Sequence, residues 1–229
     1  MNLGTGTGGD AAERRISGAL LRSLLPAVWR TLPWRALSAA AGLGLLLAAS
    51  TRLPDHAPDT YQGLFVLRLA ALVGAVGLAF LLDDPARNTS AATPIARPTR
   101  TVLRLALAAP LTALWWTTVL LLVPSPTRPP LLPITLQAAA TTVAALALAT
   151  TAIRFTDTAE VGRRTAARLG AAAAVVMLIP NRWGLLATPD DSSWEATQVR
   201  WAAILLVTLT VCALWTPERS GHGPARVRR

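Results

Sequence analysis

The sequence predicts an all-α, polytopic membrane protein that crosses the bilayer six times, with both termini in the cytoplasm. Three observations support this prediction. Hydrophobic residues make up 52% of the chain and charged residues only 15%, so the charges are too few to cover an ordinary soluble surface. The apolar residues are gathered into six runs, most of them near the roughly 20 residues that a membrane-spanning helix needs. The basic residues, all of them Arg, are concentrated in every second connection between these runs.

The first 34 residues precede the first apolar run. Residues 1–11 are rich in Gly and Thr, and we expect them to be disordered. Residues 12–34 carry Leu and Val at helical spacing among several Arg residues, which predicts an amphipathic helix lying in the cytoplasmic interface of the membrane. Trp29 and Trp34 would anchor this helix, and Pro26 and Pro33 would kink it. It either fixes the topology or packs against a cytoplasmic partner.

The six predicted spans form a transmembrane domain over residues 35–217. Polar, Pro-rich connections separate them, because a helix cannot continue there. The fifth span is the weakest, since its apolar core is short and ends at Pro180. The first span could be mistaken for a signal peptide, but cleavage would remove a span that the Arg pattern requires. The predicted spans are residues 35–53, 62–82, 102–123, 132–153, 166–180 and 199–215.

The orientation of the spans follows from the Arg residues, which are enriched on the cytoplasmic side of membrane proteins. The N-terminal segment, the second and fourth connections and the tail 218–229 are rich in Arg. The other three connections carry only Arg52, then Arg128, then Arg182 with Arg200. This alternation requires an even number of spans, with both termini on the cytoplasmic side of a bacterial cell membrane. It also accounts for the net charge of +10 without a nucleic-acid partner.

The sequence predicts no catalytic or metal site. It contains no phosphate-binding Gly motif with its Lys, and His56, His222 and Cys212 each stand alone. We therefore expect no enzymatic activity, no metal and no cofactor in this chain.

The predicted spans also contain no Asp or Glu, which argues against an ion-coupled carrier, since such carriers commonly place a carboxylate at membrane depth. Arg68 is the ionisable exception, about two turns into the second span. It either extends to the outer headgroups or lines a polar cavity for an anionic substrate or lipid. Pro110 would bend the third span ahead of Trp115 and Trp116. Arg68 and these three residues are candidates for lining a substrate path. Ordinary helix packing explains Pro110, Trp115 and Trp116 equally well.

The connection between the second and third spans is the most informative segment. Asp84 followed by Pro85 is a favourable N-cap and first helical position, and a helix over 85–93 would end before Pro94. The chain then carries Arg97 and Arg100 and enters the third span at residue 101. This pattern predicts a short amphipathic helix on the cytoplasmic side.

The arrangement resembles the permease subunits of ABC-2-type transporters, here of an actinobacterial-like exporter. Members of that family have six spans, both termini inside, an N-terminal interfacial helix and a cytoplasmic coupling helix after the second span. Their loop runs from an acidic residue to a Pro-x-x-Arg-like turn, positions that Asp83 or Asp84 and Pro94-Ile-Ala-Arg97 would occupy. Residues 181–198 would match the family's extracellular re-entrant element. The loop departs from the family by lacking its usual Glu and by carrying Ala91-Ala92 in place of long apolar residues.

The resemblance implies a permease driven by a separate cytoplasmic ATPase dimer, which would bind the ATP and Mg²⁺, and paired with a second, identical or different, permease subunit. Two other classes of function stay open. A membrane scaffold or accessory subunit would show no ATP dependence. An ion-coupled carrier, or a membrane enzyme without a recognisable motif, would act without an ATPase. The residues implied in ATPase coupling are Asp83, Asp84, Pro85, Arg87, Ala91, Ala92, Pro94, Arg97 and Arg100.

Overall fold

The computed structural model describes residues 29–30, 32–53, 59–82, 97–155, 161–179 and 184–215. The helices within these ranges account for all of their regular secondary structure, so the predicted all-α class is confirmed for this part of the chain. Each α-helix corresponds to one predicted span. They are α2 (Trp34–Ser50), α3 (Thr60–Ala79), α4 (Arg97–Leu122), α5 (Leu131–Phe155), α6 (Val161–Leu178) and α7 (Trp194–Trp215), with the 3-10 helices η1 (Phe80–Leu82) and η3 (Ser125–Thr127) between them.

Four of the described helices are long and apolar enough to cross a membrane. These are α3, α4, α5 and α7, which offer stretches of 20 to 22 residues with a mean hydropathy of 1.6 to 1.8. The apolar helix α2 is shorter, at 17 residues. The first half of α6 carries Arg163, Arg164 and Arg168, which leaves only its second half continuously apolar. The fifth predicted span is therefore also the least apolar helix in the structure.

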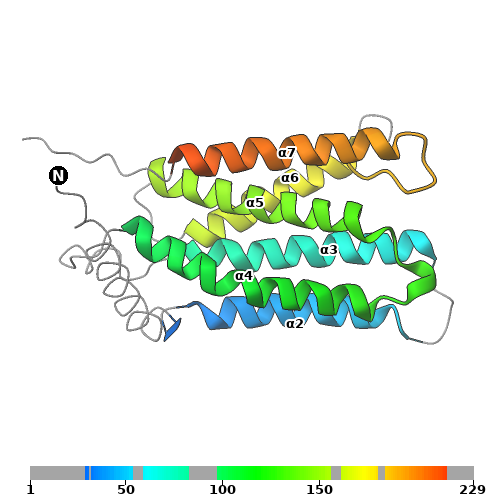
Figure 1. Cartoon of the computed structure of the whole chain (residues 1–229), viewed down its shortest axis with the longest axis horizontal. Helices are drawn as coiled ribbons and strands as arrows, with labels where there is room; N and C mark the ends of the chain where they lie inside the picture. Colours follow the sequence, from blue (N-terminus) through cyan, green and yellow to red (C-terminus); the bar gives the residue numbers. More distant parts are fainter. Residues whose placement is uncertain are drawn as a thin grey trace, which may run out of the picture.

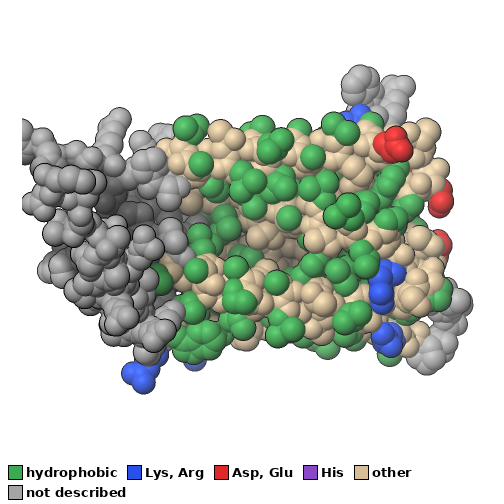
Figure 2. Space-filling model, viewed as in Figure 1, with side chains coloured by type: hydrophobic (Ala, Val, Ile, Leu, Met, Phe, Trp, Pro, Cys, Tyr) green, Lys and Arg blue, Asp and Glu red, His purple; other side chains and the backbone are tan. Residues whose placement is uncertain are grey.

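The surface of the bundle is apolar along its middle. Figure 2 shows hydrophobic side chains over the middle of the bundle, Arg side chains toward both ends and acidic side chains at the right-hand end. Leu46 of α2, Leu114 of α4 and Leu206 of α7 are exposed over 70%, 67% and 66% of their surfaces. Such an extended apolar surface is unfavourable in water but is solvated by lipid tails. These are the features of a helical membrane protein.

Three helices begin five residues earlier than the sequence predicted. The helix α4 starts at Arg97 and not at residue 102, because Pro98 lies in its first turn, where a missing N–H costs no hydrogen bond. The helices α6 and α7 start at Val161 and Trp194, ahead of the predicted residues 166 and 199. Hydropathy detects the apolar part of a helix and misses a polar first turn. The predicted helix at 85–93 lies outside the described residues. So does the predicted amphipathic helix at 12–34, except for its last few positions.

The helices α2, α3, α5 and α7 form a row in that order, each packed against the next. In Figure 1, α4 lies on the near side of this row against α2 and α3, and α6 lies on the far side against α3 and α5. Successive helices alternate in direction. The helix α2 therefore begins, and α7 ends, at one end of the bundle, which we call the terminal end (left in Figure 1). The segment between α6 and α7 lies at the opposite end.

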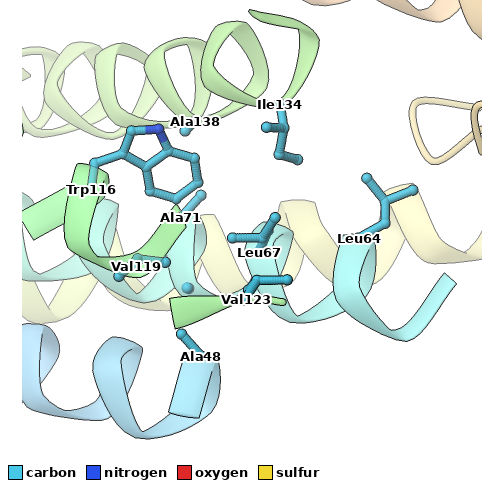
Figure 3. Close-up of a cluster of buried hydrophobic side chains, with 10 residues drawn as sticks. Ala48, Leu64, Leu67, Ala71, Trp116, Val119, Val123, Ile134 and Ala138 are labelled. Carbon is cyan, nitrogen blue, oxygen red and sulfur yellow. The ribbon is translucent and has the colours of Figure 1, made fainter. Parts of the chain in front are cut away.

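The largest buried cluster lies among α2, α3, α4 and α5 and is drawn in Figure 3. Leu64 and Leu67 of α3 meet Val119 of α4, Val123 just after it and Ile134 of α5, and all five side chains are fully buried. Lipid tails are as apolar as these side chains, so close packing, not exclusion of water, stabilises such a core in a membrane.

Trp115 of α4 fits into a notch formed by Gly44 of α2 and Gly74 of α3. A Cβ atom added at Gly74 would lie 2.6 Å from two atoms of the indole ring, and one added at Gly44 would also overlap the ring. The indole Nε1 donates a hydrogen bond to the carbonyl oxygen of Ala41, at 3.0 Å. The missing side chains of these two glycines therefore allow α4 to lie close to the row.

We expect Gly44→Ala to lower the thermal unfolding temperature of the purified protein. The new methyl group would overlap the Trp115 indole, and overpacking of this kind costs about 1–3 kcal/mol. Gly42→Ala is the matched control, because a Cβ atom at Gly42 has nothing within 4 Å and Ala is the better helix former. Unfolding in detergent, followed by tryptophan fluorescence, measures both variants. Equal unfolding temperatures would contradict the packing of Trp115 in the notch.

Candidate functional site

Among the described residues, no group of three or more His, Cys, Asp and Glu side chains is placed to hold a metal ion. The polar feature that stands out within the bundle is instead a cluster around Arg68, on the apolar helix α3. Arg68 lies eight residues after the start of α3, about 12 Å along its axis at 1.5 Å per residue.

The Arg68 guanidinium is half-buried and finds its hydrogen-bond partners within the protein. Its Nε donates to Oε1 of Gln137 on α5, at 3.0 Å. Its Nη1 and Nη2 donate to the carbonyl oxygens of Leu186, at 2.9 Å, and Ala187, at 2.7 Å. Arg68 therefore does not depend on lipid headgroups for these hydrogen bonds, because the segment before α7 folds back to meet it.

Gln137 extends the cluster toward α7. This side chain is only 2% exposed, and its Nε2 donates to Oε1 of Gln198 on α7, at 3.3 Å. The orientation of both amides follows from Arg68, because a guanidinium can only donate. Gln137 must turn its oxygen to Arg68, so its nitrogen faces Gln198, whose own oxygen then accepts. Three helices of the row are thus joined by one chain of hydrogen bonds.

The segment from Gly184 to Ala187 is irregular, and each of its four carbonyl oxygens accepts a hydrogen bond from a side chain. Arg200 donates to Gly184 at 2.9 Å, and Trp201 Nε1 donates to Leu185 at 3.0 Å, both from α7. Thr197 also approaches the Gly184 carbonyl, at 3.4 Å. Arg68 of α3 donates to the remaining two carbonyl oxygens, those of Leu186 and Ala187. We call residues 184–187 the strap, because donors from α3 and α7 hold it between these helices.

A turn over residues 188–191 follows the strap and leads into α7. The backbone N–H of Thr188 donates to Oδ2 of Asp191 at 2.7 Å, and the Thr188 hydroxyl donates to the same oxygen at 3.0 Å. The backbone hydrogen bond, followed by the hydroxyl one, holds the pKa of the Asp191 carboxyl below its ordinary value. Residues 192 and 193 complete the connection, and α7 begins at Trp194 with Glu195 in its first turn.

Non-helical backbone at membrane depth is tolerated only where the protein satisfies its polar groups. Two other arginines serve this purpose at the same end of the bundle. Arg52 donates to the carbonyl oxygens of Leu121 and Leu122, and Arg128 donates to that of Val123, at the end of α4. Every described arginine from the Arg-poor connections thus donates to backbone carbonyls.

The other residues predicted to line a substrate path lie apart from this cluster. Trp115 occupies its glycine notch, and Trp116 is 9% exposed within the main core, with Nε1 donating to the Thr135 hydroxyl at 3.3 Å. Pro110 lies inside α4 and is exposed. The structure does not bring these three residues to Arg68, and their role in a path stays a prediction.

The predicted coupling residues from Asp83 to Pro94 lie outside the described residues. Arg97 and Arg100 form the first turn of α4. Gln137, Gln198 and the strap carbonyls were not predicted as site residues. The one available signal was Gln137, the only amide side chain in the apolar run of α5.

No family model, no curated protein and no solved structure matches the chain. The geometry around Arg68 and the strap defines the chain only as a helical membrane protein with an arginine-anchored segment at one end.

We expect Arg68→Leu to destabilise the protein by about 3 kcal/mol, because it leaves three acceptors without a donor in an apolar surrounding. Arg52→Leu is the control. Arg52 also donates to two carbonyls, but it is exposed at the end of the bundle, so its loss leaves less buried polar surface unpaired. Thermal unfolding in detergent compares the two variants. A larger loss for Arg52→Leu would contradict the anchoring role of Arg68.

Proposed function

We propose that this chain is the membrane-spanning permease subunit of an ABC-type exporter in a bacterial cell membrane, driven by a separate cytoplasmic ATPase. In this proposal all six helices cross the membrane and both termini are cytoplasmic. The observation that carries the topology is the arrangement of arginines at the two ends of the bundle.

At the terminal end, Arg164 and Arg168 near the start of α6 are exposed. At the opposite end, the side chains of Arg52, Arg128 and Arg200 donate to backbone carbonyls. Their presence there is accounted for by these structural roles. The remaining, exposed positive charge favours the terminal end as the cytoplasmic one.

The coupling role is supported by the place of the connection between α3 and α4. The helix α3 ends, and α4 begins, at the terminal end, where a cytoplasmic ATPase would act. The loop sequence from Asp83 to Arg97 resembles the coupling segment of ABC-2-type permeases, as described above. In addition, the stretches of α3, α4 and α5 that are long enough to cross the membrane contain no carboxylate. An external source of energy fits this composition better than ion coupling does.

The proposed mechanism is indirect. ATP binding would close the ATPase dimer and push on the connection between α3 and α4 in each of two permease subunits. Because Trp115 ties α4 to α2 and α3, this push would move the row as a rigid body. The apolar outer faces of the helices would serve both for pairing of two permeases and for contact with lipid.

The topology can be measured by cysteine labelling in a Cys212→Ser background. We expect Ser125→Cys and Ser192→Cys, both exposed at the opposite end, to react with a membrane-impermeant maleimide in intact cells. Ser90→Cys and Ser220→Cys should react only after the membrane is permeabilised. Labelling of Ser220→Cys in intact cells would mean that one of the helices does not cross the membrane. The least apolar helix, α6, would be the first candidate.

The coupling can be measured by co-purification in mild detergent and mass spectrometry. We expect a soluble ATPase to accompany the chain and to be lost from the double variant Ala91→Asp, Ala92→Asp, because two charges would disrupt docking through the predicted amphipathic helix. The control is Ser125→Asp with Ser192→Asp, which adds the same charge at the opposite end. Absence of an ATPase from the wild-type complex, with other membrane partners retained, would favour an accessory or scaffold subunit instead.

A further inference from the structure

The positive charge of Arg68 has no carboxylate partner among the described residues. Its three hydrogen bonds go to one amide and two backbone carbonyls, which are dipoles and leave the net charge in place. The guanidinium also has five N–H groups, so two of them have no acceptor within the described part of the chain. A net charge at this depth costs free energy even when dipoles solvate it, and an opposite charge would lower that cost.

The chain of hydrogen bonds from Arg68 ends at Gln198, whose amide nitrogen is also a donor without an acceptor. Arg68 fixes the orientation of Gln137, and Gln137 fixes that of Gln198, whose Nε2 is then left as a donor. This nitrogen is buried and has no acceptor in the described structure. Since buried polar groups are almost always paired, the cluster lacks an acceptor, and the excess positive charge indicates a negatively charged one.

The cluster lies on the face of the row that α6 covers only in part. Arg68, Leu72 and Val76 share one face of α3 at a spacing of four residues, and the last two pack in the cluster that includes Leu169 of α6. The other helices cover the second half of α6 only sparsely. None of its residues from 171 to 178 is buried, and Leu178 is 84% exposed. The surface beside the cluster is therefore apolar and open to lipid.

We propose that Arg68 and Gln198 bind the acidic headgroup, a phosphate or carboxylate, of an amphiphile whose apolar part lies along the second half of α6. The headgroup oxygens would accept from Gln198 Nε2 and from the two remaining N–H groups of Arg68. They would supply both the missing acceptor and the missing charge. The strap would keep its hydrogen bonds and hold the guanidinium in place. The site does not depend on an ATPase, whereas a role of its ligand as cargo rests on the proposed permease function.

Purified chain without any ATPase can be titrated with a fluorescent phosphatidylglycerol in a neutral detergent, with phosphatidylcholine and inorganic phosphate as competitors. The decisive variant is Gln198→Glu, which keeps the shape of the side chain and still accepts from Gln137. Its second oxygen replaces the unmet donor and adds a negative charge to the hydrogen-bonded cluster that contains Arg68. We expect this variant to fold as the wild type does and to bind phosphatidylglycerol at least about ten-fold more weakly, the scale of one lost charge-assisted hydrogen bond.

Arg68→Gln should weaken binding by the same order, while Arg52→Gln, which removes an exposed arginine at the same end, should leave binding within about two-fold of wild type. Unchanged binding by Gln198→Glu would overturn the proposal, as would equal losses in Arg52→Gln and Arg68→Gln, which would indicate general attraction of acidic lipid. Equally effective competition by phosphatidylcholine would exclude recognition of the acidic group. Competition by inorganic phosphate at the concentrations where phosphatidylglycerol competes would exclude the amphiphile and leave a soluble anion.

Discussion

A backbone carbonyl in the interior of a membrane has no water to bond, and this constraint governs the opposite end of the bundle. Within the helices the carbonyls are satisfied by the helical hydrogen bonds themselves. Where helices end or the chain becomes irregular, arginine side chains take over. Arg52 and Arg128 complete the end of α4, and Arg68 and Arg200 hold the strap. A guanidinium suits this task because it presents several donors in one rigid plane and stays charged at any physiological pH.

The same constraint connects the packing of the helices to the cluster around Arg68. The strap lies between α3 and α7, within hydrogen-bonding reach of side chains from both helices. Arg200 and Trp201 on α7 fix the first half of the strap, and Arg68 on α3 fixes the second. The hydrogen bonds thereby tie α3 to α7 across α5, through Gln137 in the middle. A membrane protein gains little from the hydrophobic effect between its helices, so such polar ties and close packing carry much of its specificity.

Close packing holds the other side of the row. The Trp115 indole lies in a notch made by two glycines from different helices and donates to a backbone carbonyl of α2. A rigid α2, α3 and α4 unit, joined to α5 and α7 by the Arg68 chain, is the arrangement through which a push at the start of α4 would reach the strap. The two ends of the bundle would thus be coupled by packed elements and not by a flexible path.

Local sequence determined the elements of this protein. Runs of apolar residues locate the six helices, because the need to satisfy the backbone in lipid leaves helix as the available structure. Their polar first turns, at Val161 and Trp194, escaped detection because hydropathy measures transfer to lipid and not helix formation. The depth of Arg68 was also evident from its position in an apolar run. The partners of that arginine were decided only by the tertiary structure. Gln137, Gln198 and the strap are far from it in sequence, and two of its acceptors are backbone carbonyls, which every residue possesses and which carry no sequence signature.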